Sequence, residues 1–330
     1  MPIIDAYAHV ALPRFLSLDD QLRLMDREGV EAALLSTAET CPDLREISRA
    51  LVAHPDRFRA VGMPLGRSPA HLRDAIRAQL DSGFSGIRLP AAFIAVNPDL
   101  LDLLGAAGAF PLVVGEQGLR VAARLLADFL DHAPGRFVLA GHFAGPADPA
   151  LLDTDPALAR LFDHPGFHVA FTRHGALGHL PLEAWARAVV GRIGWPRVLW
   201  GSEWPVALWR DETYRSTLDW ALRLNPSAAD MQAMRYDNAR RLLFARPMAA
   251  QPLGAEWDLM ALRREADVWL FPPSLNLPEQ RHRPLMLAYE AWGGERRGRY
   301  SEFVLQMAER GIAARNAPQP AQPASENVTS

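Results

Sequence analysis

Side chains that exchange protons stand at the ends of several apolar runs in this sequence. The run at residues 3–9 finishes with Tyr7 and His9, which are two positions apart. Alternation along a strand places such a pair on one face, so the phenol and the imidazole should point the same way. A second run ends in His142, and a third ends in Gly-Ser before Glu203. Carboxylate, imidazole and phenol groups are common acids and bases of enzyme sites, so these four residues are the first candidates for catalysis.

Other apolar runs also finish with polar or ionisable residues. In a closed barrel of parallel strands, the carboxyl ends of all strands meet at one mouth, where the active sites of such barrels form. The residues at these ends are therefore expected to share one pocket. Besides the four named above, they are Arg88, Glu116, Gln117, Thr172, Arg173, His174 and Ser202.

Several of these residues also have a structural interpretation. His9 could be a hydrogen-bonded core histidine, and Tyr7 could be a packing residue whose hydroxyl finds a partner. Arg88 could neutralise a neighbouring carboxylate, and Glu116 could begin a helix, where its charge suits the helix dipole. For His174 we expect a solvated loop.

Eight apolar runs alternate with segments of helical spacing between the start of the chain and about residue 245. The runs are rich in Val, Ile, Leu and Phe, as are parallel strands buried on both faces. Strands that alternate with helices indicate crossover units, and eight units favour a closed (β/α)8 TIM barrel, an α/β fold, over an open sheet. Within the first run, Asp5 is expected to make hydrogen bonds rather than to react. The expected strands are 3–9, 31–37, 58–64, 84–90, 111–116, 136–142, 167–173 and 197–203, and the clearest helices are 18–28, 44–53, 70–80, 119–130 and 182–190.

The composition restricts the classes of protein to which the chain can belong. Its 330 residues, of which 49% are hydrophobic, suffice for a barrel of about 250 residues with an addition. No apolar run approaches the roughly 18 residues that span a bilayer, and no signal-peptide pattern is visible. The single cysteine, Cys41, suits a reducing compartment, and a net charge of −3 provides no basic surface for nucleic acid. We therefore expect a cytoplasmic protein with neither a membrane nor a nucleic-acid partner.

The pattern changes after Phe244. Residues 246–316 contain prolines and isolated tryptophans, and we expect a C-terminal helical appendage that packs on the barrel or joins two copies of the chain in a homo-oligomer. Residues 317–330 are rich in Pro, Ala, Gln and Ser and are expected to be disordered. Helical spacing in the appendage occurs near 256–266, 283–291 and 300–313.

Five motifs of the chain resemble, in order and spacing, those of the second amidohydrolase family. The resemblance covers about residues 1–245, and its sixth and eighth strands look most like the branch of 2-pyrone-4,6-dicarboxylate lactonase and the sugar lactonases. It implies hydrolysis; many members hold a divalent metal, whereas the pyrone-dicarboxylate lactonase type works without one. The motifs are Ile4-Asp-Ala-Tyr-Ala-His9, Gly86-Ile-Arg-Leu89, Gly141-His-Phe-Ala-Gly-Pro146, Leu199-Trp-Gly-Ser-Glu-Trp-Pro205 and Asn238-Ala-Arg-Arg-Leu-Leu243.

The chain departs from the family pattern where metal ligands are expected. By the resemblance, His9 and His142 match family histidines, and Glu203 stands in place of the aspartate base. Tyr7 replaces the first histidine of a His-x-His pair, and Glu116 lies where the fifth strand often ends in histidine. His9, Glu203 and either Glu116 or His142 could still supply three ligands to a zinc ion. A protonated phenol is a poor ligand but a good hydrogen-bond donor to an oxyanion, so a site without a cofactor is favoured.

The expected chemistry is hydrolysis of a lactone or another ester-like bond. In this hypothesis Glu203 removes a proton from water, while His9, His142 and Tyr7 polarise the carbonyl oxygen of the substrate. A lactone is activated enough to react with a carboxylate base and hydrogen-bond donors, whereas an unactivated amide would gain far more from a Lewis acid.

The substrate is expected to be a small carboxylated molecule. Arg88 and Arg173 would bind its carboxylates in fork geometry, with Glu116 and Thr172 as further substrate contacts. Two alternatives stay open. One is a decarboxylase or lyase of the same family that acts on an unsaturated or aromatic acid, and the other is a non-catalytic barrel that binds a small acid.

Overall fold

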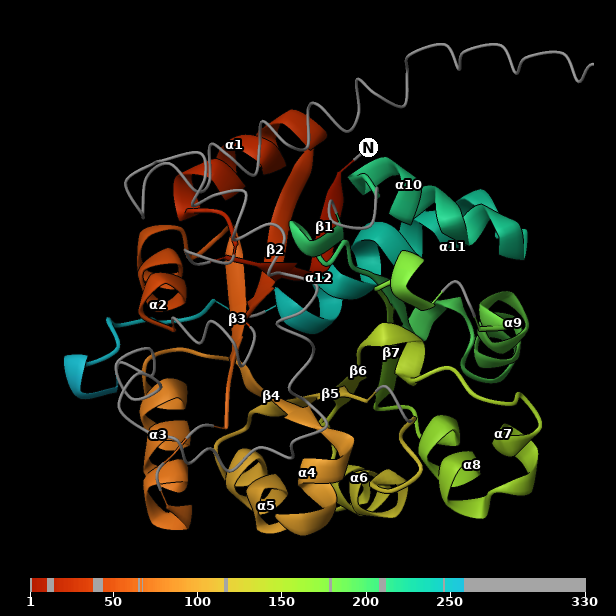
Figure 1. Cartoon of the computed structure of the whole chain (residues 1–330), viewed down its shortest axis with the longest axis horizontal. Helices are drawn as coiled ribbons and strands as arrows, with labels where there is room; N and C mark the ends of the chain where they lie inside the picture. The colour runs from red at the N-terminus through yellow and green to blue at the C-terminus, as the bar shows by residue number, and fades with distance from the viewer. Residues whose placement is uncertain are drawn as a thin grey trace, which may run out of the picture.

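Eight parallel strands form one sheet that curls into a ring, with helices around its outside (Figure 1). The structure, a computed structural model, describes residues 2–10, 15–37, 44–64, 66, 68–115, 118–177, 180–207, 212–245 and 247–257. Each strand pairs in parallel with the next one along the chain, from β1 to β8. The predicted (β/α)8 barrel is therefore confirmed. The strands are β1 Ile3–His9, β2 Val30–Ser36, β3 Phe58–Gly62, β4 Gly86–Pro90, β5 Phe110–Val114, β6 Val138–Ala140, β7 Phe167–Phe171 and β8 Val198–Trp200.

The strands are buried on both faces because their side chains alternate between the inside of the ring and the helix layer. Leu112 and Val113 are neighbours in β5, yet they belong to two different apolar clusters. The inner cluster includes Leu112, Ile4 and Leu199, and the outer one includes Val113 and the residues of the surrounding helices. This double burial explains why the strands read as continuous apolar runs in the sequence.

Backbone hydrogen bonds join β1 to the segment that follows β8 and close the ring. The amide of Glu203 donates to the carbonyl oxygen of Tyr7 at 2.8 Å, and the amide of His9 donates to the carbonyl oxygen of Trp204 at 2.8 Å. Three of these four residues are catalytic candidates, so the closure of the barrel itself brings their backbones together.

Helices fill the connections between strands, and several have identifiable ends. Helix α1 begins after Ser17, whose hydroxyl accepts a hydrogen bond from the amide of Asp20, and it ends at Gly29, whose φ of 73° is left-handed. The helices are α1 Leu18–Glu28, α2 Leu44–Ala53, α3 Pro69–Asp81, α4 Ala91–Val96, α5 Asp99–Ala106, α6 Ala123–Asp131, α7 Leu151–Thr154, α8 Pro156–Asp163, α9 Leu182–Ile193, α10 Tyr214–Asp219, α11 Ala228–Gln232 and α12 Asn238–Leu243.

The longer helices agree best with the sequence prediction. The predicted helices 18–28 and 44–53 coincide with α1 and α2. Helices α4, α5, α7 and α8 are not expected from the sequence, because each has eight residues or fewer, which is too short a segment to predict a helix from its periodicity.

The predicted last residues of six strands, β2, β3, β5, β6, β7 and β8, lie one to three residues too far along the chain, and three of these errors concern site residues. The sequence suggests strands that continue through His142, Arg173 and Glu203, whereas β6, β7 and β8 stop two or three residues earlier. The φ angles of these three residues are 54°, 66° and 58°. Left-handed backbone is incompatible with an extended strand, so the three side chains leave from turns just beyond the strand ends.

Residues 247–257 run beside α2 and α3, where the amide of Leu253 donates to the hydroxyl of Ser48 at 2.7 Å. Apart from residues 256 and 257, the predicted appendage helices lie outside the described residues, as do Cys41 and the predicted disordered tail. The domain boundary near residue 245 and the homo-oligomer stay predictions. In the described part of the chain, no helix combines the length and apolarity needed to cross a membrane.

Candidate functional site

Tyr7 lies at the centre of the predicted site. It is fully buried, and its ring centroid is 5.3 Å from that of His9 and 5.2 Å from that of His142. A Cβ atom at Gly201 would come within 2.7 Å of the Cβ atom of Tyr7, so the end of β8 can approach this tyrosine only with glycine there. The phenol is thus held between two imidazoles from β1 and from the turn after β6.

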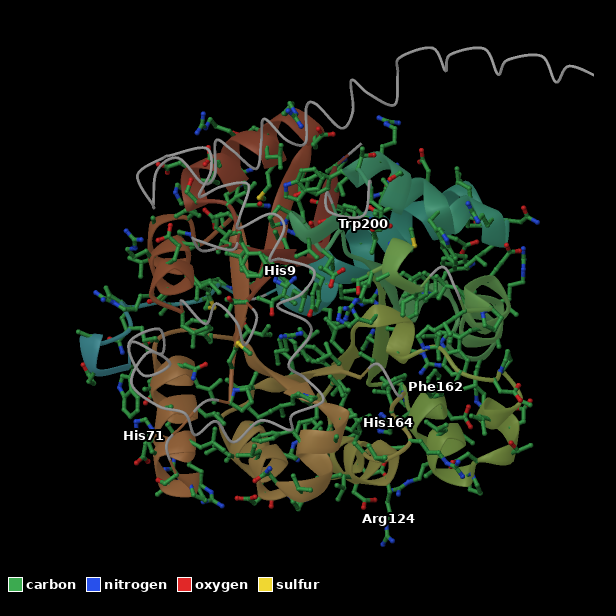
Figure 2. All side chains as sticks on the ribbon, in the orientation of Figure 1. His9, His71, Arg124, Phe162, His164 and Trp200 are labelled. Carbon is green, nitrogen blue, oxygen red and sulfur yellow. The ribbon has the colours of Figure 1, made fainter. Side chains whose placement is uncertain are left out.

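His9 is fixed by contacts on two sides. Its Nδ1 atom lies 3.2 Å from the carbonyl oxygen of Ser36 at the end of β2, and its ring stacks on Phe15 at 4.7 Å. Only 4% of the residue is exposed. Figure 2 shows His9 near the middle of the molecule, whereas His71, Arg124 and His164 lie toward its periphery.

His142 is held by Thr172, which follows β7. The Thr172 hydroxyl oxygen accepts a hydrogen bond from the backbone amide of His142 at 2.8 Å and lies 2.8 Å from its ring Nδ1. Thr172 is fully buried and His142 is 2% exposed. The structure therefore shows Thr172 in contact with a candidate catalytic residue, a partnership for which the sequence carries no visible signal.

Glu203 and the two arginines complete the carboxyl-end rim, the name used below for Tyr7, His9, Arg88, His142, Thr172, Arg173 and Glu203. Glu203 is 5% exposed, and its backbone is bonded to Tyr7 as described above. Arg88 is 6% exposed, and its Nη1 donates to the carbonyl oxygen of Thr37 at 3.1 Å. Arg173 is half-buried. Glu116 and Gln117 lie outside the described residues.

His174, although adjacent to the rim in sequence, does not follow the prediction of a solvated loop. It is 4% exposed, and its ring packs against Phe143 at 5.0 Å and Trp220 at 5.5 Å. The backbone is left-handed at Arg173, and the side chain of the next residue, His174, packs in an aromatic cluster with Phe143 and Trp220. Hydropathy alone could not reveal this, because the aromatic partners come from distant segments.

Asp5 supports the rim without belonging to it. One carboxylate oxygen accepts hydrogen bonds from the amides of Tyr7 at 3.0 Å and Ser202 at 2.9 Å, and the other pairs with the hydroxyl of Ser202. Burial raises the pKa of this carboxyl to about 7, although the hydrogen bonds from Ser202 and Tyr7 favour the charged form. The prediction that Asp5 makes hydrogen bonds is confirmed, and these bonds tie β1 to the segment after β8.

The described residues test one form of the zinc alternative, in which the ligands are His9, His142 and Glu203. Among the described residues, no group of three His, Cys, Asp or Glu side chains is arranged to hold a metal ion, so His9, His142 and Glu203 do not form such a set. Tyr7 occupies the position between the two imidazoles. The donor chemistry of the rim, with a phenol in place of an imidazole, suits hydrogen bonding to an oxyanion better than ligation of zinc.

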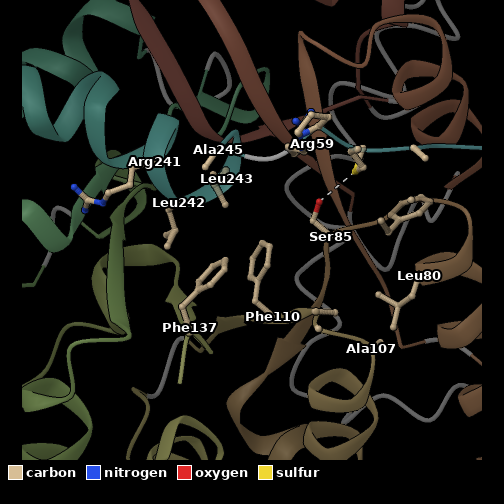
Figure 3. Close-up of a pocket in the computed structure, with 18 residues that line it drawn as sticks. Arg59, Leu80, Ser85, Ala107, Phe110, Phe137, Arg241, Leu242, Leu243 and Ala245 are labelled. Atoms are coloured by element: carbon tan, nitrogen blue, oxygen red, sulfur yellow. Dashed lines mark hydrogen bonds between the residues drawn. The ribbon is translucent and has the colours of Figure 1, made fainter. Parts of the chain in front are cut away.

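Two cavities lie at the opposite end of the ring, which we call the amino-end rim. One, of about 580 Å³, is lined in part by Arg59, Phe110, Phe137 and Arg241 (Figure 3). The other, of about 570 Å³, shares Phe137 and adds His168. Their size would favour this end as a binding site, but none of the candidate residues lines either cavity. We favour the carboxyl-end rim, because barrels of this kind place their reacting groups there.

Comparisons with known proteins agree with this architecture. A candidate 2-pyrone-4,6-dicarboxylic acid hydrolase from Pseudomonas putida is 24% identical, with a TM-score of 0.55 over 73% of this chain and 96% of that one. An amidohydrolase from Burkholderia multivorans with bound zinc is 19% identical, with a TM-score of 0.54 over 75% and 100%. A 2,6-dihydroxybenzoate decarboxylase from Rhizobium is 17% identical, with a TM-score of 0.55 over 74% and 98%.

These structural similarities support the fold, whereas the family is identified by a match of the sequence to a family model. The comparison with curated proteins found no match. The family model described as amidohydrolase matches residues 3–245, which span the whole ring of strands and α12. The resemblance of the five sequence motifs is thereby confirmed, and the chain belongs to the amidohydrolase family.

Proposed function

We propose that this protein is a hydrolase that opens a lactone or another ester-like bond in a small carboxylated substrate. The observation that carries the proposal is the contact of Tyr7 with both His9 and His142, beside a carboxylate whose backbone is bonded to that same tyrosine. Hydrogen-bond donors and a base are then available at one mouth, as hydrolysis of a carbonyl compound requires.

The reaction begins with removal of a proton from water by the carboxylate of Glu203. The water oxygen forms a bond to the carbonyl carbon, and the negative charge that develops on the carbonyl oxygen is stabilised by donors of the carboxyl-end rim, foremost Tyr7 and His142. The ring C–O bond then breaks, and the proton taken up by Glu203 passes to the leaving oxygen. The product is a ring-opened molecule with a new carboxylate and a new hydroxyl group.

Recognition of a carboxylated substrate is assigned to Arg88 and Arg173. Arg88 lies within β4 and Arg173 follows β7, and the Nη1 atom of Arg88 donates to the carbonyl oxygen of Thr37, which orients its guanidinium. A planar guanidinium binds a carboxylate through two parallel hydrogen bonds. The hydroxyl of Thr172 contacts His142, so we assign it to positioning of that imidazole. Glu116 stays a predicted substrate contact.

A decarboxylase is the second candidate, because a 2,6-dihydroxybenzoate decarboxylase is among the structural neighbours. The similarity to a 2-pyrone-4,6-dicarboxylic acid hydrolase supports the lactone instead, at a higher identity. The phenol of Tyr7 favours the same choice, since it can donate a hydrogen bond to the oxyanion of a lactone without a Lewis acid.

Product analysis in ¹⁸O-labelled water tests the proposal. The purified protein is incubated separately with 2-pyrone-4,6-dicarboxylate and with 2,6-dihydroxybenzoate, and ring opening, carbon dioxide release and isotope content are measured. We expect ring opening with one labelled oxygen in the new carboxylate and no carbon dioxide. Release of carbon dioxide would identify a decarboxylase. Binding of both acids without any product would identify a non-catalytic barrel.

A further inference from the structure

We infer that His9 and His142 are held in opposite neutral tautomers, so that His142 offers a ring N–H to the substrate whereas His9 offers a lone pair. The inference rests on the proposed function for its catalytic meaning, but the tautomers themselves follow from hydrogen bonding alone. From the sequence, both histidines are expected to polarise the substrate carbonyl. The tautomers leave this role to His142 and give His9 a different one.

The tautomer of His9 is set by the carbonyl group of Ser36. The Nδ1 atom of His9 lies 3.2 Å from this oxygen. A carbonyl oxygen can only accept a hydrogen bond, so Nδ1 must carry the proton. In a neutral ring the other nitrogen, Nε2, is then an acceptor. Stacking on Phe15 at 4.7 Å fixes the plane of the ring and therefore the direction of this lone pair.

The tautomer of His142 is set by the single proton of the Thr172 hydroxyl group. The hydroxyl oxygen already accepts a hydrogen bond from the His142 amide at 2.8 Å. Thr172 is fully buried, and within the described part of the chain its other hydrogen-bonding contact is the ring Nδ1 of His142, at 2.8 Å. A buried hydroxyl proton requires an acceptor, and Nδ1 is the acceptor at hand. The ring proton of His142 then resides on Nε2.

These tautomers give the two histidines different tasks. His142 donates its Nε2–H to the developing oxyanion, as Tyr7 does with its hydroxyl group. His9 accepts a hydrogen bond from the attacking water and aligns it, while Glu203 takes the other proton. His142 and His9 are then catalytic residues, and Thr172 is a positioning residue that acts through His142.

Nitrogen NMR of the ¹⁵N-histidine-labelled protein tests the inference without any substrate, because protonated and bare ring nitrogens resonate far apart. The signals are assigned with His9→Gln and His142→Gln, at a pH where both rings are neutral. We expect the proton on Nδ1 of His9 and on Nε2 of His142. A proton on Nδ1 of His142, or on Nε2 of His9, overturns the inference.

Variants of Thr172 test its positioning role. Thr172→Val keeps the shape and removes the hydroxyl, so the Nε2–H tautomer of His142 should lose its preference and kcat should fall roughly 10- to 100-fold. Thr172→Ser should restore both. Thr217→Val is the matched control, since Thr217 is equally buried but donates to Tyr214, and it should change neither. An unchanged His142 spectrum in folded Thr172→Val contradicts the inference.

The same data separate this inference from the proposed function. Opposite tautomers in a protein that opens no lactone would support the inference and contradict the hydrolase. Lactone opening by a protein in which both histidines share one tautomer would support the hydrolase and contradict the inference.

Discussion

The two rims of the barrel are built from the same strands but use them differently. At the carboxyl-end rim, three strands are followed by left-handed residues, and polar side chains surround a buried tyrosine. At the amino-end rim, Phe110 stacks on Phe137 at 4.5 Å, and the guanidinium of Arg59 lies 4.7 Å from the ring centre of Phe244. Left-handed backbone costs roughly 1–2 kcal/mol per residue outside glycine. Unfavourable backbone conformations therefore occur at the carboxyl-end rim, and favourable aromatic packing occurs at the amino-end rim.

This difference supports our proposal that the carboxyl-end rim carries the function, although both cavities lie at the amino-end rim. Unfavourable backbone persists where the surrounding structure holds it for a purpose, and it is common at active sites. Packing between aromatic rings and a stacked cation serves stability. The comparison predicts that substitutions at the carboxyl-end rim change kinetics, and that substitutions at the amino-end rim change the free energy of unfolding.

Replacement of Glu203 should have the largest effect. Glu203→Gln keeps the shape of the side chain and removes the base, so kcat should fall by roughly 10²- to 10⁴-fold while the far-UV circular dichroism stays the same. Glu183→Gln is the control, because Glu183 is an exposed carboxylate paired with Arg187 in α9. A Glu203→Gln enzyme with normal turnover would remove the base from the mechanism.

Asp5 should make stability fall as pH rises. Its pKa in the folded state is raised from its ordinary value of 3.8 to about 7, chiefly by burial. Between these values the folded state keeps a proton that the unfolded chain has lost, so the free energy of unfolding decreases with pH, by up to about 4 kcal/mol. Asp5→Asn, which imitates the protonated carboxyl, should lack this decrease. Denaturant unfolding at several pH values measures it, and parallel curves for the two proteins would contradict the assignment.

His168, at the amino-end rim, should have the opposite sign. Burial, assisted by the charges of Arg241 and Arg197, lowers its pKa from the ordinary value of 6.5 to about 4. Between pH 4 and 6.5 the imidazole is protonated in the unfolded chain but neutral in the folded state. The contribution of His168 to the free energy of unfolding is therefore fully present above the pKa of the unfolded state. It is lost as the pH falls toward 4, by up to about 3 kcal/mol. The same unfolding measurements on His168→Gln should show a flatter curve on the acid side, with kcat unchanged at neutral pH.

The smallest of the four effects is expected for the arginines. Arg88→Ala should raise KM for a dicarboxylate substrate by about 10- to 100-fold, as loss of a charge-assisted hydrogen bond implies, with a smaller change in kcat. Arg241→Ala is its counterpart at the amino-end rim and should leave KM unchanged. Equal KM values for Arg88→Ala and the unsubstituted protein would refute the carboxylate clamp, and a raised KM in Arg241→Ala would refute the contrast between the rims.

The sequence was most informative where periodicity is long or burial is continuous. Helices α1 and α2 and strand β1 agree with prediction to the residue, because eleven, ten and seven consecutive residues repeat one pattern. Residues 142, 173 and 203 were placed in strands because hydropathy carries no information about the sign of φ. The convergence of Tyr7, His9 and His142 could be expected from the barrel alone.

The partners that orient the site residues could not be found in the same way. Ser36 binds His9 through its backbone carbonyl, a group that every residue possesses, so no residue type marks it. Thr172 binds His142 across two strands, and its neighbour His174 turns away into the aromatic cluster. The directions of these two side chains depend on the conformation of one turn. Tertiary packing, rather than local propensity, determines that conformation.

The left-handed turns at Arg173 and Glu203 have a consequence for laboratory evolution. Glycine would relax the backbone at either position and strengthen the fold. A screen for thermal stability without an activity assay should therefore select glycine at positions 173 and 203. Variants with glycine at position 203 should be more stable but lack the proposed base.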